Sequence, residues 1–128
     1  EFILPLANQV IEILKEVQQF TGTGKYVFPS FTKKDKPMSD NTLIGALRRM
    51  GYTKEEFVPH SFRAMFSTIA YENMNEHQCS GEVIEALLAH KETNKVKEAY
   101  NRATYKQGMK KLIDWYSNHL TFIVQIKI

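Results

Sequence analysis

The sequence predicts a mainly α fold with a few short β-strands, and three observations lead to that prediction. Apolar residues recur at intervals of three and four along most of the chain, which is the period of an amphipathic helix. Serine, asparagine and glycine stand at positions typical of helix ends. The 128 residues are 43% hydrophobic and 24% charged, which fits one globular domain with a core of its own.

The first helix is expected over about residues 7–20. Its apolar residues follow the spacing i, i+3, i+4, i+7, and they are Val10, Ile13, Leu14 and Val17. Two Thr-Gly pairs at residues 21–24 end this helix. A short extended run is predicted at residues 26–28, and a polar, Lys-rich loop at residues 31–37.

Three further helices follow, each with a recognisable signal at one end. Ser39 is a good N-cap for a helix that Gly51 terminates. A third helix is expected over about residues 60–73, and Ser80 caps a fourth that delivers His90 at its end.

The C-terminal third is predicted to hold two helices and a strand. Asn94 can cap a short helix that carries Tyr100, and a separate long helix is expected over about residues 104–120. Alternating apolar residues after position 121 predict a strand. Because an isolated strand is unstable, Thr121–Ile128 is expected to pair with a sheet edge, in its own domain or in a neighbouring subunit.

The third helix places polar and apolar residues on opposite faces. On a helical wheel its apolar residues share one face that should be buried, namely Phe62, Met65, Phe66 and Ile69. The opposite arc carries His60 and Arg63 with the small residues Ala64 and Ser67. An imidazole and a guanidinium that point together beside small neighbours favour an active site over a packing role.

Positive charge is concentrated in two segments. Residues 25–54 hold seven Lys or Arg and two Asp, and residues 91–111 hold seven Lys or Arg and two Glu. Residues 55–90 between them hold one Arg and six Glu. Phosphate is therefore a plausible partner, although solvated Lys-rich faces would produce the same pattern.

Several protein classes are disfavoured. The longest apolar stretch, residues 120–128, is too short to span a bilayer, so no membrane partner is expected. The first residues lack both a basic n-region and an initiator Met, which suggests an excised fragment. Cys79 is the single cysteine, which suits a reducing compartment, and the cytoplasm is expected. His77 beside it has the wrong spacing for a zinc site, so no metal is expected.

Four residues could together break a phosphodiester bond. Tyr100 offers a phenol nucleophile, which needs a nearby base or cations at neutral pH because its unperturbed pKa is about 10. Arg63 offers a planar fork that matches two phosphate oxygens. His60 and His90 can donate hydrogen bonds to phosphate or move protons. Tyr105 begins an apolar stripe and is expected in the core.

These residues resemble the motifs of the tyrosine recombinases, specifically of prophage and genomic-island integrases. His60-x-x-Arg63 matches their His-x-x-Arg motif, Leu88-Ala89-His90 their Leu-Gly/Ala-His motif, and Tyr100 the nucleophile. Five further segments carry the resemblance to the subgroup: 3–6, 26–30, 37–43, 46–52 and 114–115.

The resemblance implies a bacterial or phage-encoded enzyme for DNA integration and recombination. Residues 1–128 would be the C-terminal part of its catalytic domain, and Tyr100 would form a 3'-phosphotyrosyl link without any cofactor. The family also uses an earlier Arg and a hairpin Lys, which lie upstream of the segment matching residues 3–5. The 128 residues are therefore expected to have an incomplete site and to be inactive alone.

Double-stranded DNA and other integrase protomers, in a synaptic tetramer, are the expected partners. The basic residues assigned to DNA contact are Lys33, Lys34, Lys36, Arg48, Arg49, Lys91 and Lys95. The alternative is a non-catalytic DNA-binding or assembly module. Tyr100 and Arg63 favour the enzyme, because phosphate binding alone does not need a positioned phenol.

Overall fold

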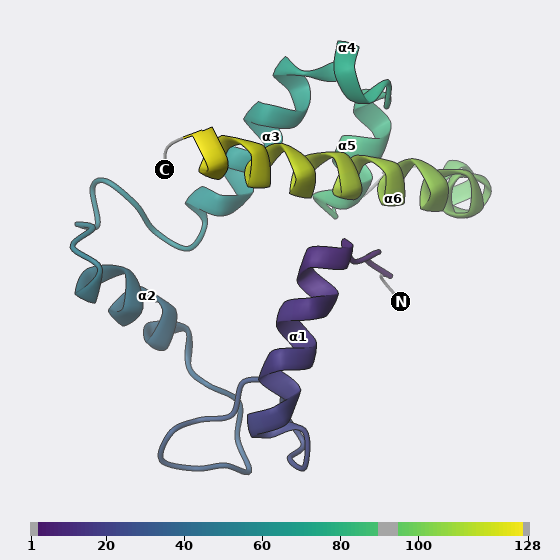
Figure 1. Cartoon of the computed structure of the whole chain (residues 1–128). Coiled ribbons are helices and arrows are strands. Elements are labelled where there is room, and N and C mark those ends of the chain that lie inside the picture. Colours follow the sequence, from purple (N-terminus) through teal and green to yellow (C-terminus); the bar gives the residue numbers. More distant parts are fainter. Residues whose placement is uncertain (1–2, 90–94, 127–128) are drawn as a thin grey trace. The chain divides into compact units, whose positions relative to one another are not determined.

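The computed structural model of the chain is mainly α, as the sequence predicts. It describes the backbone of residues 3–89 and 95–126, and the side chains of these residues except 95–104 and 126. The helices are α1 (Asn8–Thr21), α2 (Asp40–Arg49), α3 (Ser61–Glu72), α4 (Met74–His77), α5 (Gly81–Leu87) and α6 (Lys95–Ile126), as Figure 1 shows. Within the described ranges, the β-structure is one isolated antiparallel bridge between Pro29 and Pro37.

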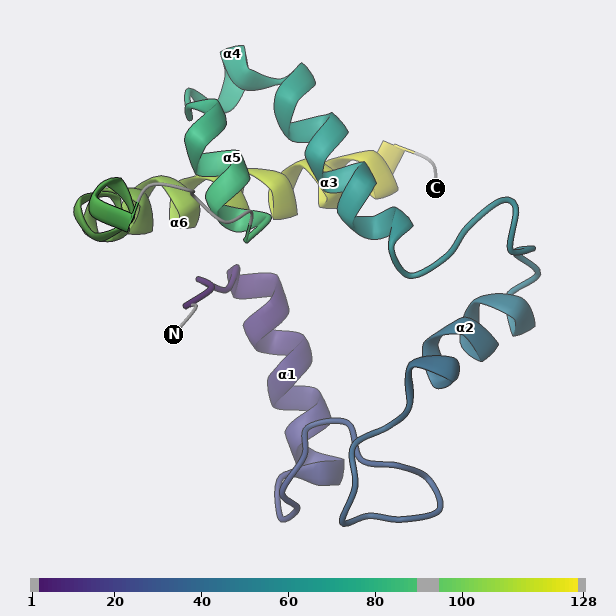
Figure 2. The same cartoon turned by 180° about the vertical axis from the view of Figure 1, so that it is seen from behind.

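The chain divides into two compact units. One is Val10–Arg63, and the other, called the core unit here, combines Glu1–Gln9 with Ala64–Ile128. Helices α4, α5 and α6 lie wholly in the core unit and can be followed from two sides in Figures 1 and 2.

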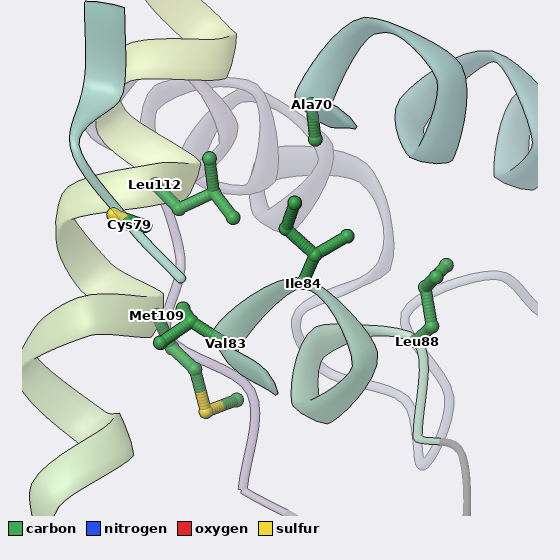
Figure 3. Packing of buried hydrophobic residues seen from close by; sticks show 7 residues of the cluster. All are labelled: Ala70, Cys79, Val83, Ile84, Leu88, Met109 and Leu112. Carbon is green, nitrogen blue, oxygen red and sulfur yellow. The ribbon is translucent and has the colours of Figure 1, made fainter. Parts of the chain in front are cut away.

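The hydrophobic core lies in the core unit, where α5 packs against α6. Ile84 of α5 and Leu112 of α6 are fully buried. The cluster around them, drawn in Figure 3, consists of Ala70, Cys79, Val83, Ile84, Leu88, Met109 and Leu112. Val83 and Ile84 are thus the buried residues of α5.

Helices α5 and α6 approach each other closely at Gly108. A Cβ atom added there would lie 2.9 Å from Cγ2 of Val83, which is closer than real Cβ contacts. Val83 is buried and β-branched, so its side chain has little freedom to move away. The missing side chain at residue 108 is what lets the two helices meet.

The prediction of two C-terminal helices and a strand is wrong for the residues described. A single helix, α6, runs from Lys95 to Ile126. Gly108 is the only Gly or Pro in that range, and extending a helix costs far less than starting one. Ile123 occupies a position that alternation requires to be polar, so residues 122–124 form a continuous apolar run that a helix accommodates equally well. Phe122 and Val124 are exposed on it.

Helix α4 was not predicted from the sequence. It has four residues, Met74–His77, which is too short for an apolar period to be visible. Gln78 then adopts a left-handed conformation with φ of 57° and leads to Ser80, the N-cap of α5.

The Val10–Arg63 unit contains α2 and most of α1. Ser39 precedes α2 as predicted, but its Oγ lies 3.3 Å from Oγ1 of Thr42 and makes no capping bond to the backbone. Gly51 has φ of 97°, the left-handed conformation expected of a glycine after a helix end. The apolar residues of α1 are half-buried or exposed, and none is fully buried.

Candidate functional site

His60 and Arg63 lie together at the beginning of α3. The amide of Arg63 donates a hydrogen bond to the carbonyl oxygen of His60 over 3.1 Å, so the two residues share one helical turn. Ser61 closes this turn, because its Oγ accepts a hydrogen bond from the amide of Val58 over 3.2 Å. His60 is exposed and Arg63 is half-buried. His60 immediately precedes α3 and Arg63 lies in its first turn, so this backbone bond keeps the two residues close at the start of the helix.

The apolar face of α3 is only partly buried. Phe66 is half-buried and packs edge-to-face on Tyr116 with ring centroids 5.0 Å apart. The expectation for Phe62 is wrong, because this side chain is 55% exposed. It lies in the first turn of α3, where its ring contacts the ring of Phe57 in the preceding loop at 4.9 Å.

The other two candidate catalytic residues are described less completely. His90 lies outside the described residues, as does Lys91. Tyr100 lies on α6, where the structure describes the backbone alone, and Lys95 is the first residue of that helix.

The turn that leads to residue 90 explains one feature of the Leu88-Ala89-His90 motif. Leu88 is buried in the core, and Ala89 has φ of 51°. This left-handed conformation is uncommon for residues with a Cβ atom and costs glycine nothing. Glycine, the other residue that the motif allows at this position, would adopt the conformation without strain.

The basic residues assigned to DNA contact differ in their surroundings. Lys33, Lys34 and Lys36 are exposed on a loop whose base is closed by a 2.8 Å hydrogen bond from the amide of Ser30 to the carbonyl of Lys36. Arg49 at the end of α2 is also exposed.

Arg48 has a structural contact that the sequence did not indicate. Its Nη1 donates to the carbonyl oxygens of Tyr52 over 2.7 Å and of Phe57 over 3.0 Å. This guanidinium thus holds the loop that follows α2. Nearby, the hydrogen bonds that Thr53 donates lower the pKa of Glu56, and the charge of Arg48 adds a smaller effect.

Two tyrosines from other helices donate hydrogen bonds to the carboxylates of α5. The hydroxyl of Tyr71 on α3 donates to Oε1 of Glu85 over 2.6 Å. The hydroxyl of Tyr105 on α6 donates to Oε2 of Glu82 over 2.9 Å. The hydrogen bond to Glu85 raises the pKa of Tyr71, because ionisation would remove the donated proton. Tyr105 also packs against the core, as predicted.

His77 is a buried structural residue. Its Nε2 lies 2.7 Å from the carbonyl oxygen of Ala70, and its Nδ1 accepts a hydrogen bond from the amide of Cys79 over 3.0 Å. Its ring packs on that of Trp115, with centroids 5.0 Å apart. Burial raises the pKa of the Cys79 thiol. Across the described ranges, no three His, Cys, Asp or Glu residues are placed to hold a metal ion.

None of the helices within the described residues has the length and apolar character needed to cross a membrane.

Comparison with known proteins identifies relatives over most of the chain. The model of the phage integrase family matches residues 1–107. The prophage integrase IntA of Escherichia coli K12 is 33% identical over 115 residues, which make up 90% of this chain and 27% of that protein. The integrase of Shigella phage Sf6 is 33% identical over 119 residues, or 92% of this chain and 30% of the relative.

The integrase of Enterobacteria phage P4 is 34% identical over 122 residues, which make up 94% of this chain and 27% of that integrase. The chain thus spans 27–30% of the length of these three curated relatives. No solved structure matches it.

Proposed function

The chain belongs to the phage integrase family, and we propose that it takes part in site-specific DNA recombination by tyrosine-mediated cleavage and rejoining of strands. The phenol oxygen of Tyr100 attacks a backbone phosphorus, and the bond from phosphorus to the 5'-oxygen breaks. A 3'-phosphotyrosyl link and a free 5'-hydroxyl result. Attack of such a hydroxyl on the link in a partner duplex rejoins the strand and releases the tyrosine.

The observation that carries this proposal is the shared turn of His60 and Arg63 within the region that matches the family. The family match also covers His90 and Tyr100. Arg63 holds two non-bridging phosphate oxygens through its planar fork and offsets the charge that develops on them. His60 and His90 donate to phosphate oxygens or pass a proton to the leaving 5'-oxygen.

Double-stranded DNA is the proposed substrate, and further integrase protomers on DNA are the proposed partners. The exposed residues Lys33, Lys34, Lys36 and Arg49 support backbone contact, because Lys and Arg neutralise phosphates and release counterions. Lys91 and Lys95 are proposed to contribute in the same way. Arg48 contributes charge from a guanidinium that also holds the loop after α2.

The test is covalent capture of DNA by the full-length protein on a nicked suicide substrate. We expect Tyr100→Phe to abolish the protein–DNA adduct and Tyr105→Phe to retain it, because the phenylalanine at position 100 has no nucleophilic oxygen. An adduct that survives Tyr100→Phe and disappears with Tyr105→Phe would assign the nucleophile to Tyr105. DNA binding without any adduct in the wild-type protein would instead support a non-catalytic DNA-binding or assembly module.

A further inference from the structure

The contact between Tyr105 and Glu82 joins the part of α6 that follows Tyr100 to α5. The phenol donates to the Glu82 carboxylate over 2.9 Å, and its ring packs against the hydrophobic core. A hydrogen bond to a charged acceptor is stronger than one between neutral groups, and it also has a preferred direction. This contact therefore restrains the rotation of α6 about its own axis.

A second contact restrains the same stretch of α6. Gly108 lies one turn after Tyr105, and the close approach there to Val83 fixes the separation between α6 and α5. Met109, the next residue, and Leu112, about one turn later, enter the core, as Figure 3 shows. Glu82 and Val83 are consecutive residues of α5, so the hydrogen bond and the apolar contact both join α6 to the first turn of α5.

Position 100 is close to this anchored stretch along a continuous helix. Tyr100 precedes Tyr105 by five residues, and a helix rises about 1.5 Å per residue, so the two Cα atoms are about 7.5 Å apart along the axis. The backbone of an α-helix is stiff over such a distance. A rotation of α6 at Tyr105 is therefore transmitted to the backbone at position 100.

We infer that Tyr105 and Glu82 act as a positioning pair that sets the orientation of the α6 turn carrying Tyr100. The inference rests on the proposed function, in which Tyr100 is the nucleophile. Tyr105 touches neither DNA nor the reacting atoms in this scheme. It acts through the helix that it orients.

The experiment measures single-turnover adduct formation by the full-length protein at saturating DNA, together with DNA affinity. We expect Tyr105→Phe to slow adduct formation by about tenfold while DNA affinity stays unchanged. A tenfold slower rate corresponds to an activation free energy raised by about 1.4 kcal/mol through the misorientation of Tyr100. Glu82→Gln keeps a side-chain oxygen that accepts from the phenol and should retain most of the rate. Glu82→Leu lacks an acceptor and should be as slow as Tyr105→Phe.

The double variant Tyr105→Phe/Glu82→Leu should be no slower than either single variant, since both remove the same contact. Tyr116→Phe is the matched control: it removes a hydroxyl from a half-buried tyrosine of the same helix, farther from position 100, and should react at the wild-type rate. Wild-type rates for Tyr105→Phe, or additive effects in the double variant, would overturn the inference.

Hydrogen–deuterium exchange separates this inference from the proposed function. Amides of residues 99–104 should exchange faster in Tyr105→Phe than in the wild type, and Tyr116→Phe should leave them unchanged. If the wild-type protein forms no adduct, the proposed function fails, and faster exchange in Tyr105→Phe would still support the anchoring of α6. Unchanged exchange in that case would overturn the anchoring as well.

Discussion

At the scale of single residues, His77 shows how a buried imidazole becomes a structural group. The carbonyl of Ala70 can only accept a hydrogen bond, and the amide of Cys79 can only donate one. The ring therefore carries its proton on Nε2 and leaves Nδ1 as an acceptor. Because both nitrogens are engaged by the backbone, the neighbouring His77 and Cys79 serve the fold and not a metal ion.

Replacing His77 should destabilise the protein strongly. His77→Ala leaves the buried Cys79 amide without its acceptor and opens a cavity beside Trp115, so we expect a loss of about 3 kcal/mol in the free energy of unfolding. His119 is the control: it is half-buried, and its ring stacks on that of Trp115 with centroids 4.9 Å apart. His119→Ala should lower the free energy of unfolding by about 1 kcal/mol or less. Urea denaturation of both variants measures the difference, and equal losses would contradict the structural role of His77.

Arg63 is the residue for which charge and geometry can be separated. Arg63→Lys keeps the positive charge and loses the planar fork that spans two phosphate oxygens. We expect it to cleave a suicide substrate nearly as slowly as Arg63→Ala, with both about 10²–10³-fold below the full-length wild type. Near-normal cleavage by Arg63→Lys would mean that charge alone matters at this position.

At the scale of elements, the pairing of α5 with α6 depends on a residue that has no side chain. Gly108 lies inside a long helix, where glycine is ordinarily unfavourable by about 1 kcal/mol relative to alanine. At this position glycine is favoured over alanine, because an added methyl group would lie 2.9 Å from Val83 and would have to displace a buried, stiff side chain.

Gly108→Ala should therefore destabilise the protein by about 1–2 kcal/mol, despite the better helix propensity of alanine. Trimming the opposing residue in Gly108→Ala/Val83→Ala should make the added methyl group harmless relative to Val83→Ala alone. Gly45→Ala on α2 is the control, because its Cβ would meet only Nη1 of Arg49 at 3.4 Å, and it should stabilise by up to about 1 kcal/mol. Thermal unfolding of the variants tests all three; a stabilising Gly108→Ala would show that the two helices can separate without cost.

Elements with strong local signals could be predicted from the sequence, and contacts between distant residues could not. Ser39 and Gly51 bracket α2 as expected, and the spacing of His60 and Arg63 placed them on one turn. The apolar pattern after residue 121 suits either a strand or a helix. These residues are helical up to Ile126 because α6 extends into them, and extending a helix costs less than starting a new element. The bond between Tyr105 and Glu82 joins residues 23 positions apart, for which no local pattern exists.

At the scale of the whole molecule, this chain corresponds to a limited part of its relatives. It spans 27–30% of the length of the three integrases compared. The resemblance to tyrosine recombinases places an Arg and a Lys of the catalytic set ahead of the segment that matches residues 3–5. The proposed transfer would need all of these charges in one site, since each would offset part of the charge of the transition state.

We therefore expect a polypeptide of residues 1–128 to leave a suicide substrate uncut under conditions in which the full-length protein forms its adduct. Gel analysis of labelled DNA after denaturation measures both. The isolated polypeptide should still bind duplex DNA weakly and with a strong dependence on salt, because its exposed lysines remain. Efficient cleavage by residues 1–128 alone would show that this polypeptide already holds a complete catalytic set.

The unbroken course of α6 constrains how many residues can separate Tyr100 from Gly108. Each residue inserted into a helix turns everything beyond it by about 100° and shifts it by about 1.5 Å. A single insertion between these positions would therefore swing position 100 to another side of the helix while Gly108 kept its place against Val83. The loop of residues 30–36, closed at its base by backbone hydrogen bonds, would absorb an extra residue locally. Insertions and deletions that accumulate during divergence of this protein should thus collect in that loop and spare residues 101–107.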